Sequence, residues 1–132
     1  MSSIFSKIIN REIPGYIVWE NERFCAFLDI RPVNPGHLLI VPKNEIGYVF
    51  EMDDAEYTEL FLVAKQLSKP LQQATDAKRI GIVIEGFSID HVHLHLVPIN
   101  NEGELDPHRA KDAVAADLEA LAEKIKSAIL TN

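Results

Sequence analysis

The sequence predicts an α+β fold in which an antiparallel sheet of about five strands carries one inserted helix and one C-terminal helix. Three observations predict it. Short β-prone runs follow one another between turn signals, two longer segments place apolar residues at helical spacing, and neither a repeat nor a linker divides the chain. The length of 132 residues suits one domain, so we treat residues 1–132 as a single unit.

The first half of the chain supplies three of the expected strands. Residues 16–19 and 23–29 are β-prone runs joined by a short polar segment at residues 20–22, which indicates a hairpin. Residues 31–36 contain two prolines and a glycine and therefore form a turn-rich connection. Residues 37–42 follow as a short, nearly continuous apolar strand.

The inserted helix is expected to begin at Asp53, with Glu56 three residues later completing a capping box. Pro70 should kink or end it, because proline lacks an N–H donor and clashes with the preceding turn. Its apolar residues recur at helical spacing: Leu60, Val63, Ala64, Leu67 and Leu71. The second helix covers about residues 111–130, and its apolar stripe consists of Val114, Leu118, Leu121 and Ile125.

Two further strands are expected between these helices. Residues 79–85 are β-branched and apolar on both faces, which is typical of a central strand. Residues 86–89 turn the chain into the last strand, expected over residues 90–99, which carries three of the five histidines.

Composition limits what the protein does. Apolar residues make up 47% and charged residues 25%, as in a globular protein. The net charge of -7 argues against a protein that coats nucleic acid, but it permits binding of one nucleotide through backbone N–H groups and histidines. No apolar run reaches the length of a membrane span, and the N-terminus lacks a signal-peptide pattern. Cys25 is the only cysteine, so we expect a cytoplasmic protein without disulfides.

His91, His93 and His95 occupy strictly alternate positions, which places them on one face of the last strand. The alternating apolar residues Val92, Leu94 and Leu96 then point into a core. Successive rings are expected ~6.6 Å apart, at two rises of a strand, so a phosphate can touch one ring and its neighbour. Imidazole titrates near neutrality, and one ring can therefore act as a nucleophile while another donates a proton.

Two other interpretations of the histidines stay open from the residues alone. They form a solvated polar face on an edge strand, or they hold zinc with a third ligand from the nearby polar residues His95, His37, Asp90 or Glu85. Phosphate chemistry is the interpretation we favour, with no metal and no cofactor. His108 sits beside a proline in a loop and has no expected role.

The run His-Val-His-Leu-His-Leu-Val at residues 91–97 resembles the His-φ-His-φ-His-φ-φ signature of the histidine triad superfamily. Residues 4–14 resemble the family's opening segment. Residues 27–32 and 35–42 resemble its central segment, with the spacing from Asp29 to His37 intact. The resemblance covers most of residues 1–98 in order and is closest to the nucleoside phosphoramidase branch. It implies a HIT-like fold, a nucleotide substrate and a homodimer that joins two sheets.

The resemblance also implies roles for individual residues. His93 matches the nucleophile, which attacks an α-phosphorus and forms a nucleotidyl-histidine that water then hydrolyses. His95 matches the residue that contacts the phosphate or the departing group. His91 matches a supporting residue that helps to fix the His93 tautomer. His37 matches a fourth histidine of the site, and Asp29 the acid that accepts from the ribose hydroxyls. The residues that match the base pocket are Ile4, Phe5, Ile8, Phe27 and Ile30.

Two segments depart from the family pattern. Residues 85–90 look shorter than the usual loop before the triad and contain no Gln, so Ser88 is expected to supply the hydroxyl to the phosphate, while Asp90 adds a negative charge nearby. After the triad, a polar loop over residues 100–112 leads into a helix, where the phosphoramidase branch has a short tail.

The resulting functional prediction is hydrolysis of purine nucleoside 5'-monophosphate derivatives, such as phosphoramidates or aminoacyl adenylates, with His93 as nucleophile. Three alternatives stay open. They are cleavage of dinucleoside polyphosphates by the same chemistry, a nucleotide-binding module with vestigial catalysis, and a zinc hydrolase that uses the histidine strand.

Overall fold

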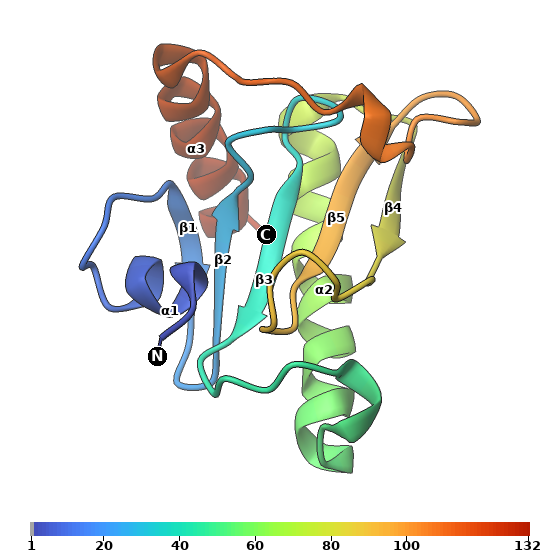
Figure 1. Ribbon diagram of the computed structural model, residues 1–132. Coiled ribbons are helices and arrows are strands. Elements are labelled where there is room, and N and C mark those ends of the chain that lie inside the picture. Colours follow the sequence, from blue (N-terminus) through green and yellow to red (C-terminus); the bar gives the residue numbers. More distant parts are fainter. Residues whose placement is uncertain (1) are drawn as a thin grey trace.

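Five strands form one antiparallel sheet in the computed structural model, which describes residues 2–132, and the strand order is β1-β2-β3-β5-β4. Along the chain the strands are β1 (Ile17–Glu20), β2 (Phe24–Leu28), β3 (Leu38–Pro42), β4 (Arg79–Val83) and β5 (Leu94–Ile99). The helices are α1 (Ile4–Ile9), α2 (Asp54–Thr75) and α3 (Ala115–Leu130), with short 3-10 turns η1 (Val49–Glu51) and η2 (Pro107–Arg109). Figure 1 shows α2 and α3 behind the sheet and α1 in front of it. The predicted α+β class is confirmed.

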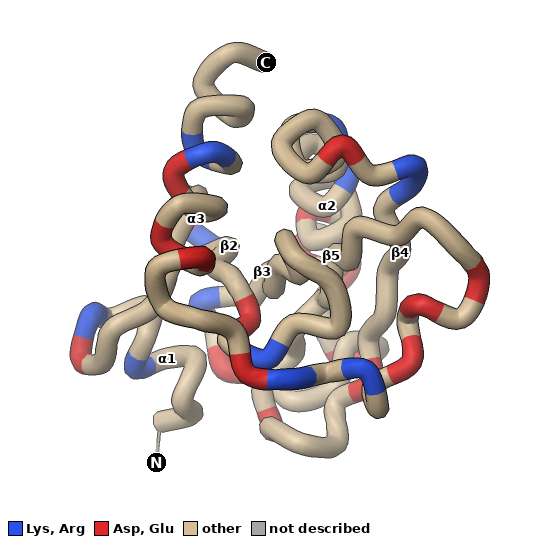
Figure 2. The backbone as a smooth tube through the Cα atoms, turned by 90° about the horizontal axis from the view of Figure 1, so that it is seen from above, with Lys and Arg blue, Asp and Glu red and all other residues tan. Residues whose placement is uncertain are grey.

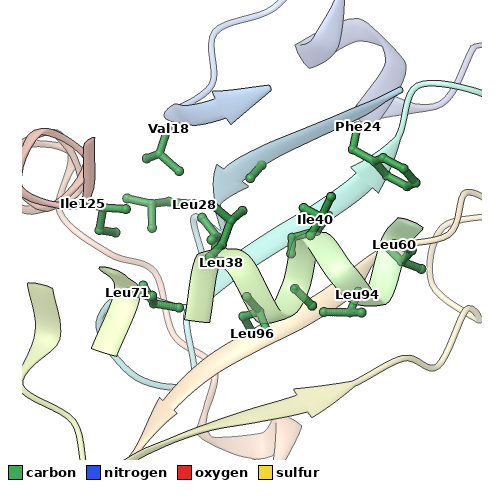
Figure 3. Packing of buried hydrophobic residues seen from close by; sticks show 14 of the residues in the cluster. Val18, Phe24, Leu28, Leu38, Ile40, Leu60, Leu71, Leu94, Leu96 and Ile125 are labelled. Carbon is green, nitrogen blue, oxygen red and sulfur yellow. The ribbon is translucent and has the colours of Figure 1, made fainter. Parts of the chain in front are cut away.

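The side chains of the strands alternate between these two faces. Phe24, Ala26 and Leu28 of β2 face the large helices, whereas Cys25 and Phe27 face α1. The core on the helix side is the larger one, and Figure 3 shows β3 and β5 packing their apolar residues against α2. Because both faces of β2 and β3 are covered, every residue of these two strands is buried.

The predicted hairpin is present, and Asn21 explains its turn. The Asn21 side-chain oxygen accepts hydrogen bonds from the backbone N–H groups of Arg23 and Phe24, at 2.9 and 2.8 Å. This turn sets the register in which Ile17 faces Phe27 across β1 and β2.

Helix α2 begins as expected but does not end at Pro70. The Asp53 side chain accepts from the Glu56 N–H at 2.8 Å, yet Glu56 does not complete the capping box, and its Oε1 is buried without a partner. The helix runs on to Thr75 because Leu71 and Ala74, beyond the proline, are buried in the core. Their burial outweighs the hydrogen bond that proline forfeits.

The expectation of a central strand over residues 79–85 is wrong. Strand β4 ends at Val83, pairs with β5 and lies at the edge of the sheet. Ile82 is 47% exposed on it. The composition of a run that is apolar on both faces does not distinguish a central strand from an edge strand, because an edge strand whose side chains are covered by other groups can carry the same residues.

Two other boundaries differ from the prediction. The last strand begins at Leu94 rather than Asp90, so His91 and His93 lie in the segment that leads into it. Helix α3 begins at Ala115, which leaves Val114 exposed as its N-cap. The residues that α3 buries are Leu118, Ala122 and Ile125.

Basic and acidic residues are mixed along the described part of the chain. Figure 2 shows basic residues interspersed with acidic ones along α3 and the outer loops over residues 2–132. None of the helices in this part of the chain is both long and apolar enough to cross a membrane.

Candidate active site

The histidines lie on the sheet face that α1 covers, because the residues between them point to the other face. Val92, Leu94 and Leu96 are buried in the core beside α2. His91 and His93 are buried, and His95 is half-buried. The ring centroids of His93 and His95 are 5.0 Å apart, closer than the ~6.6 Å expected from the rise of a strand, and the ring planes meet edge to face at 61°.

The hydrogen bond that His93 makes fixes its tautomer. His93 Nδ1 lies 2.8 Å from the backbone carbonyl oxygen of His91. A carbonyl only accepts, so Nδ1 carries a hydrogen, and among the two neutral tautomers the bond selects the one with the lone pair on Nε2. The Phe5 ring of α1 packs against this imidazole, at 4.9 Å between centroids. In the tautomer that this bond selects, the free lone pair of His93 is on Nε2.

The ring of His91 serves as a structural anchor beneath the site. Its Nε2 donates to the Pro42 carbonyl oxygen at 2.7 Å, so its Nδ1 accepts from the Ser3 hydroxyl at 2.6 Å. Burial lowers the pKa of His91 and favours the neutral ring. His91 thus links β3 to the start of α1, and it reaches His93 through its backbone carbonyl rather than through its ring.

His37 and His95 form a second pair with fixed tautomers. The Val33 N–H donates to His37 Nδ1 at 3.1 Å, so His37 carries its hydrogen on Nε2 and donates it to His95 Nδ1 at 2.8 Å. The remaining nitrogen of His95, Nε2, then carries a hydrogen. Burial is the main cause that lowers the pKa of His37 and that of His95, the latter to about 3, and the neighbouring histidines lower both further. Both rings are therefore neutral near pH 7.

Asp29 lies at the end of β2, close to this pair. Its Oδ2 is 3.7 Å from His37 Nε2, but with His37 neutral this contact is not an ion pair. Its Oδ1 accepts from the Arg31 N–H at 2.9 Å, which fixes the carboxylate at the start of the turn.

A cavity of about 290 Å³ lies between α1, β2 and the histidines, and we call it the nucleoside cavity, after the ligand that the sequence resemblance implies. It contains every residue that the resemblance assigned to the nucleotide, together with two of the histidines: Ile4, Phe5, Ile8, Phe27, Asp29, Ile30, Ser88, His93 and His95. Phe5 and Phe27 are buried, while Ile4 and Ile30 are exposed. The cavity is also lined by Ile13, Pro14 and Gly15, which were not expected from the sequence. A Cβ added at Gly15 would lie 2.5 Å from Ile8 Cγ2, so a larger residue there would force the Ile8 side chain to shift.

The loop before the triad places Ser88 beside the histidines and directs the Asp90 side chain away from them. Ser88 lines the nucleoside cavity together with His93 and His95. Asp90 lies against Gly47, where an added Cβ would meet the Asp90 carboxylate. The negative charge of Asp90 therefore lies beside the β3–α2 connection. In the same loop, Gly86 has a φ of +94°, which permits the turn that follows β4.

Asp29, His37 and His95 are also the candidate metal ligands in the described part of the chain, with one ligand atom each within 4.8 Å of one another. This set differs from the one considered in the sequence analysis, because it includes Asp29 and leaves out His93. His37 Nε2 and His95 Nδ1 already bond to each other, so a metal would have to replace that hydrogen bond.

Two residues near the site were missed from the sequence. Ser3 caps α1 and bonds His91, and Glu45 accepts from the Ser6 hydroxyl at 2.7 Å and from the Ser3 N–H. Ser3 precedes an apolar run, so its role as the N-cap of α1 could have been predicted from the sequence. Glu45 is distant in sequence and carried no signal.

The fold and the site together define a class of protein. An antiparallel sheet presents the imidazoles of His93 and His95 to an apolar cavity that the Asp29 carboxylate also lines, an arrangement suited to nucleotide phosphate chemistry. A sequence model of the HIT domain matches residues 10–102, and the chain therefore belongs to the HIT, or histidine triad, family.

Relatives and solved structures agree with this assignment. An uncharacterized HIT-like protein of Methanocaldococcus jannaschii is 35% identical over 127 residues, which are 93% of this chain and 98% of that protein. An adenosine 5'-monophosphoramidase of Schizosaccharomyces pombe is 33% identical, with 77% of each chain covered. A crystal structure of a hypothetical histidine triad nucleotide-binding protein from Sulfolobus tokodaii superposes with a TM-score of 0.85 at 32% identity, over 96% of this chain and 91% of that one. These findings support a nucleotide hydrolase of the histidine triad type.

Proposed function

We propose that this protein hydrolyses purine nucleoside 5'-monophosphate derivatives, such as adenosine phosphoramidates and aminoacyl adenylates, through a covalent nucleotidyl-His93. The observation that carries the proposal is the hydrogen bond from His93 Nδ1 to the His91 carbonyl, 2.8 Å long. It leaves the lone pair on Nε2, beside a cavity lined with apolar side chains and Asp29. The phosphoramidase name of the fission yeast relative supports the choice of substrate.

The reaction on a phosphoramidate has two displacements. In the first, a bond forms from His93 Nε2 to phosphorus as the phosphorus–nitrogen bond breaks. The electron pair of that bond stays on the departing nitrogen, which takes up one proton from solvent and leaves as an amine. In the second, water attacks phosphorus, the pair of the phosphorus–Nε2 bond returns to His93, and one proton is released. The protons balance, and water is the only co-reactant.

The other residues bind and orient the substrate in this proposal. The base lies among Ile4, Phe5, Ile8, Phe27 and Ile30, and Asp29 accepts from the ribose hydroxyls. His95 Nε2–H and the Ser88 hydroxyl donate to phosphoryl oxygens. The neutrality of His37 and His95 supports this role for His95, because a neutral ring locked by His37 presents a donor without an acid–base change.

Release of AMP from an adenosine phosphoramidate tests the proposal. The purified protein should release AMP at a saturable rate, and His93→Ala should lower kcat by at least about a thousandfold. His108→Ala is the matched control, because the His108 side chain is exposed in the loop before α3 and does not line the nucleoside cavity. Tight AMP binding without turnover would indicate a binding module instead. Turnover that stops in EDTA and returns with zinc would indicate a zinc hydrolase.

A homodimer and a cytoplasmic location complete the proposed function. Strand β4 forms an edge of the sheet that no other strand of residues 2–132 pairs with, and it exposes Ile82, which supports the joining of two sheets. Cys25, the one cysteine of the sequence, is a buried free thiol, so the fold uses no intrachain disulfide, which is typical of a reducing compartment. Sedimentation equilibrium should give twice the chain mass of 14.8 kDa, and Ile82→Lys should shift it toward the monomer.

A further inference from the structure

A second cavity, of about 310 Å³, meets the nucleoside cavity at the triad. His93, His95 and Ser88 line both of them. The nucleoside cavity extends from these residues toward α1 and β2, and the second cavity extends toward β4 and the loop of residues 100–112. A phosphorus atom bonded to His93 Nε2 would therefore have a separate cavity on each side.

The outer wall of the second cavity is the polar loop of residues 100–112. Leu105 and Pro107 of this loop line the cavity. Leu105 lies against Gly81 of β4, where an added Cβ would come within 3.0 Å of the leucine side chain. Gly81 thus leaves the room in which Leu105 rests, and the loop closes over β4 and β5.

Hydrogen bonds hold this loop in place. Within the loop, Glu104 Oε1 accepts from the backbone N–H groups of Asn100 and Asn101, at 2.5 and 2.9 Å. The Asn100 side-chain oxygen accepts from the backbone N–H of Lys78, outside the loop, at 3.0 Å. At the other end, Arg109 donates to the Asn34 side-chain oxygen at 2.6 Å. Because both ends of the loop are attached to the body of the protein, its wall is a preformed part of the cavity.

The chemistry of the cavity selects among leaving groups. Its lining outside the triad region is mainly apolar: Val33, Val83, Val97, Leu105 and Pro107. Glu85 is its one acidic residue, and among residues 2–132 no arginine or lysine lines it. A polyphosphate placed here would meet a carboxylate and apolar carbon without a compensating cation, which is unfavourable. An uncharged or cationic group with apolar carbon would be favoured.

We propose that this second cavity, the leaving-group cavity, binds the amine half of a phosphoramidate that carries an apolar substituent, and that it disfavours polyphosphate leaving groups. The inference rests on the proposed hydrolysis at His93 and adds the class of leaving group. The amine nitrogen lies next to phosphorus at the triad, and its substituent contacts Val97 and Leu105. When the phosphorus–nitrogen bond breaks, the amine takes a proton from solvent and leaves through the mouth beside Glu85.

A substrate series tests the inference. The substrates are unsubstituted adenosine phosphoramidate, its N-isopentyl derivative, its N-carboxymethyl derivative and diadenosine triphosphate. We expect kcat/KM for the isopentyl derivative to exceed that for each of the other three by about tenfold or more. Equal values for all four, or a preference for the triphosphate, would overturn the inference while leaving the hydrolysis at His93 intact. Release of AMP from none of them would overturn the proposed function and this inference together.

Variants assign the selectivity to the cavity. Leu105→Ala should lower the ratio of kcat/KM for the isopentyl derivative to that for the unsubstituted phosphoramidate by about tenfold. Leu62→Ala is the matched control, because Leu62 is exposed on α2, and its ratio should equal that of the wild type. Pro107→Ala provides a second test if Leu105→Ala does not fold, and it should lower the ratio in the same direction. An unchanged ratio in the folded cavity variants would overturn the inference.

Discussion

Ser3→Ala is the substitution that most sharply tests how the triad is held. The Ser3 hydroxyl donates to His91 Nδ1 at 2.6 Å and accepts from the Ser6 N–H at 3.0 Å as the cap of α1. Without it, a ring nitrogen of the fully buried His91 loses its partner, which costs about 1–3 kcal/mol. Loss of the helix cap costs about 1 kcal/mol more. We expect the free energy of unfolding to fall by about 2–3 kcal/mol, since the two losses share one hydroxyl.

Urea unfolding at pH 7 measures this loss, and two variants control it. Ser3→Thr keeps the hydroxyl and should lose less than about 0.5 kcal/mol, and Ser2→Ala, at an exposed neighbour, should match the wild type. Helix α1 also carries Phe5 against His93, so Ser3→Ala should lower kcat/KM as well. A loss below about 0.5 kcal/mol for Ser3→Ala would refute the assignment of the Ser3–His91 bond as a support of the site.

Three further predictions concern stability. Burial holds the pKa of His95 at about 3 in the folded protein, so as the pH falls this ring is protonated in the unfolded chain before it is protonated in the folded one. Stability contributed by this ring is therefore complete above pH 6.5 and is lost by at most ~1.4 kcal/mol per pH unit down to about pH 3. His95→Gln should give a shallower slope in urea unfolding at pH 4.5–7, and an unchanged slope would contradict the assignment. Gly36→Ala should lower Tm by several degrees more than Gly103→Ala in calorimetry. Both glycines have positive φ, but only at Gly36 would an added Cβ meet another residue, Thr75, at 2.6 Å. Equal shifts in Tm would contradict this packing argument. Leu60→Ala should cost about 2–5 kcal/mol in urea unfolding, and a loss below ~1 kcal/mol would be inconsistent with its position in the core.

The parts of the fold that local patterns determine could be predicted from the sequence. Alternation along residues 91–97 correctly placed Val92, Leu94 and Leu96 in the core, and the polar turn at residues 20–22 correctly joined a hairpin. The order of the strands in the sheet, in contrast, depends on pairing between distant segments and not on local patterns. Strand β4 resembles a central strand in composition, and only the pairing of β3 with β5 moves it to the edge.

Long-range contacts explain the remaining differences. Pro70 lies within α2 because the residues that follow it are buried in the core. This burial depends on tertiary packing, which helix propensity alone does not predict. The tautomers of the four histidines depend on the carbonyls of His91 and Pro42, on the Ser3 hydroxyl and on the Val33 N–H, which only folding brings together. The leaving-group cavity needs the loop of residues 100–112 to return to β4, and the polar composition of that loop gave no indication of this.

The stereochemical course at phosphorus tests the central claim, that His93 forms a covalent intermediate, most directly. An adenosine phosphorothioamidate of one configuration is hydrolysed in water labelled with heavy oxygen, and the configuration of the product is read by phosphorus NMR. Attack by His93 Nε2 followed by attack by water comprises two in-line displacements, each with inversion, so we predict net retention. Net inversion would show a single displacement by water and would contradict a nucleophilic role for His93.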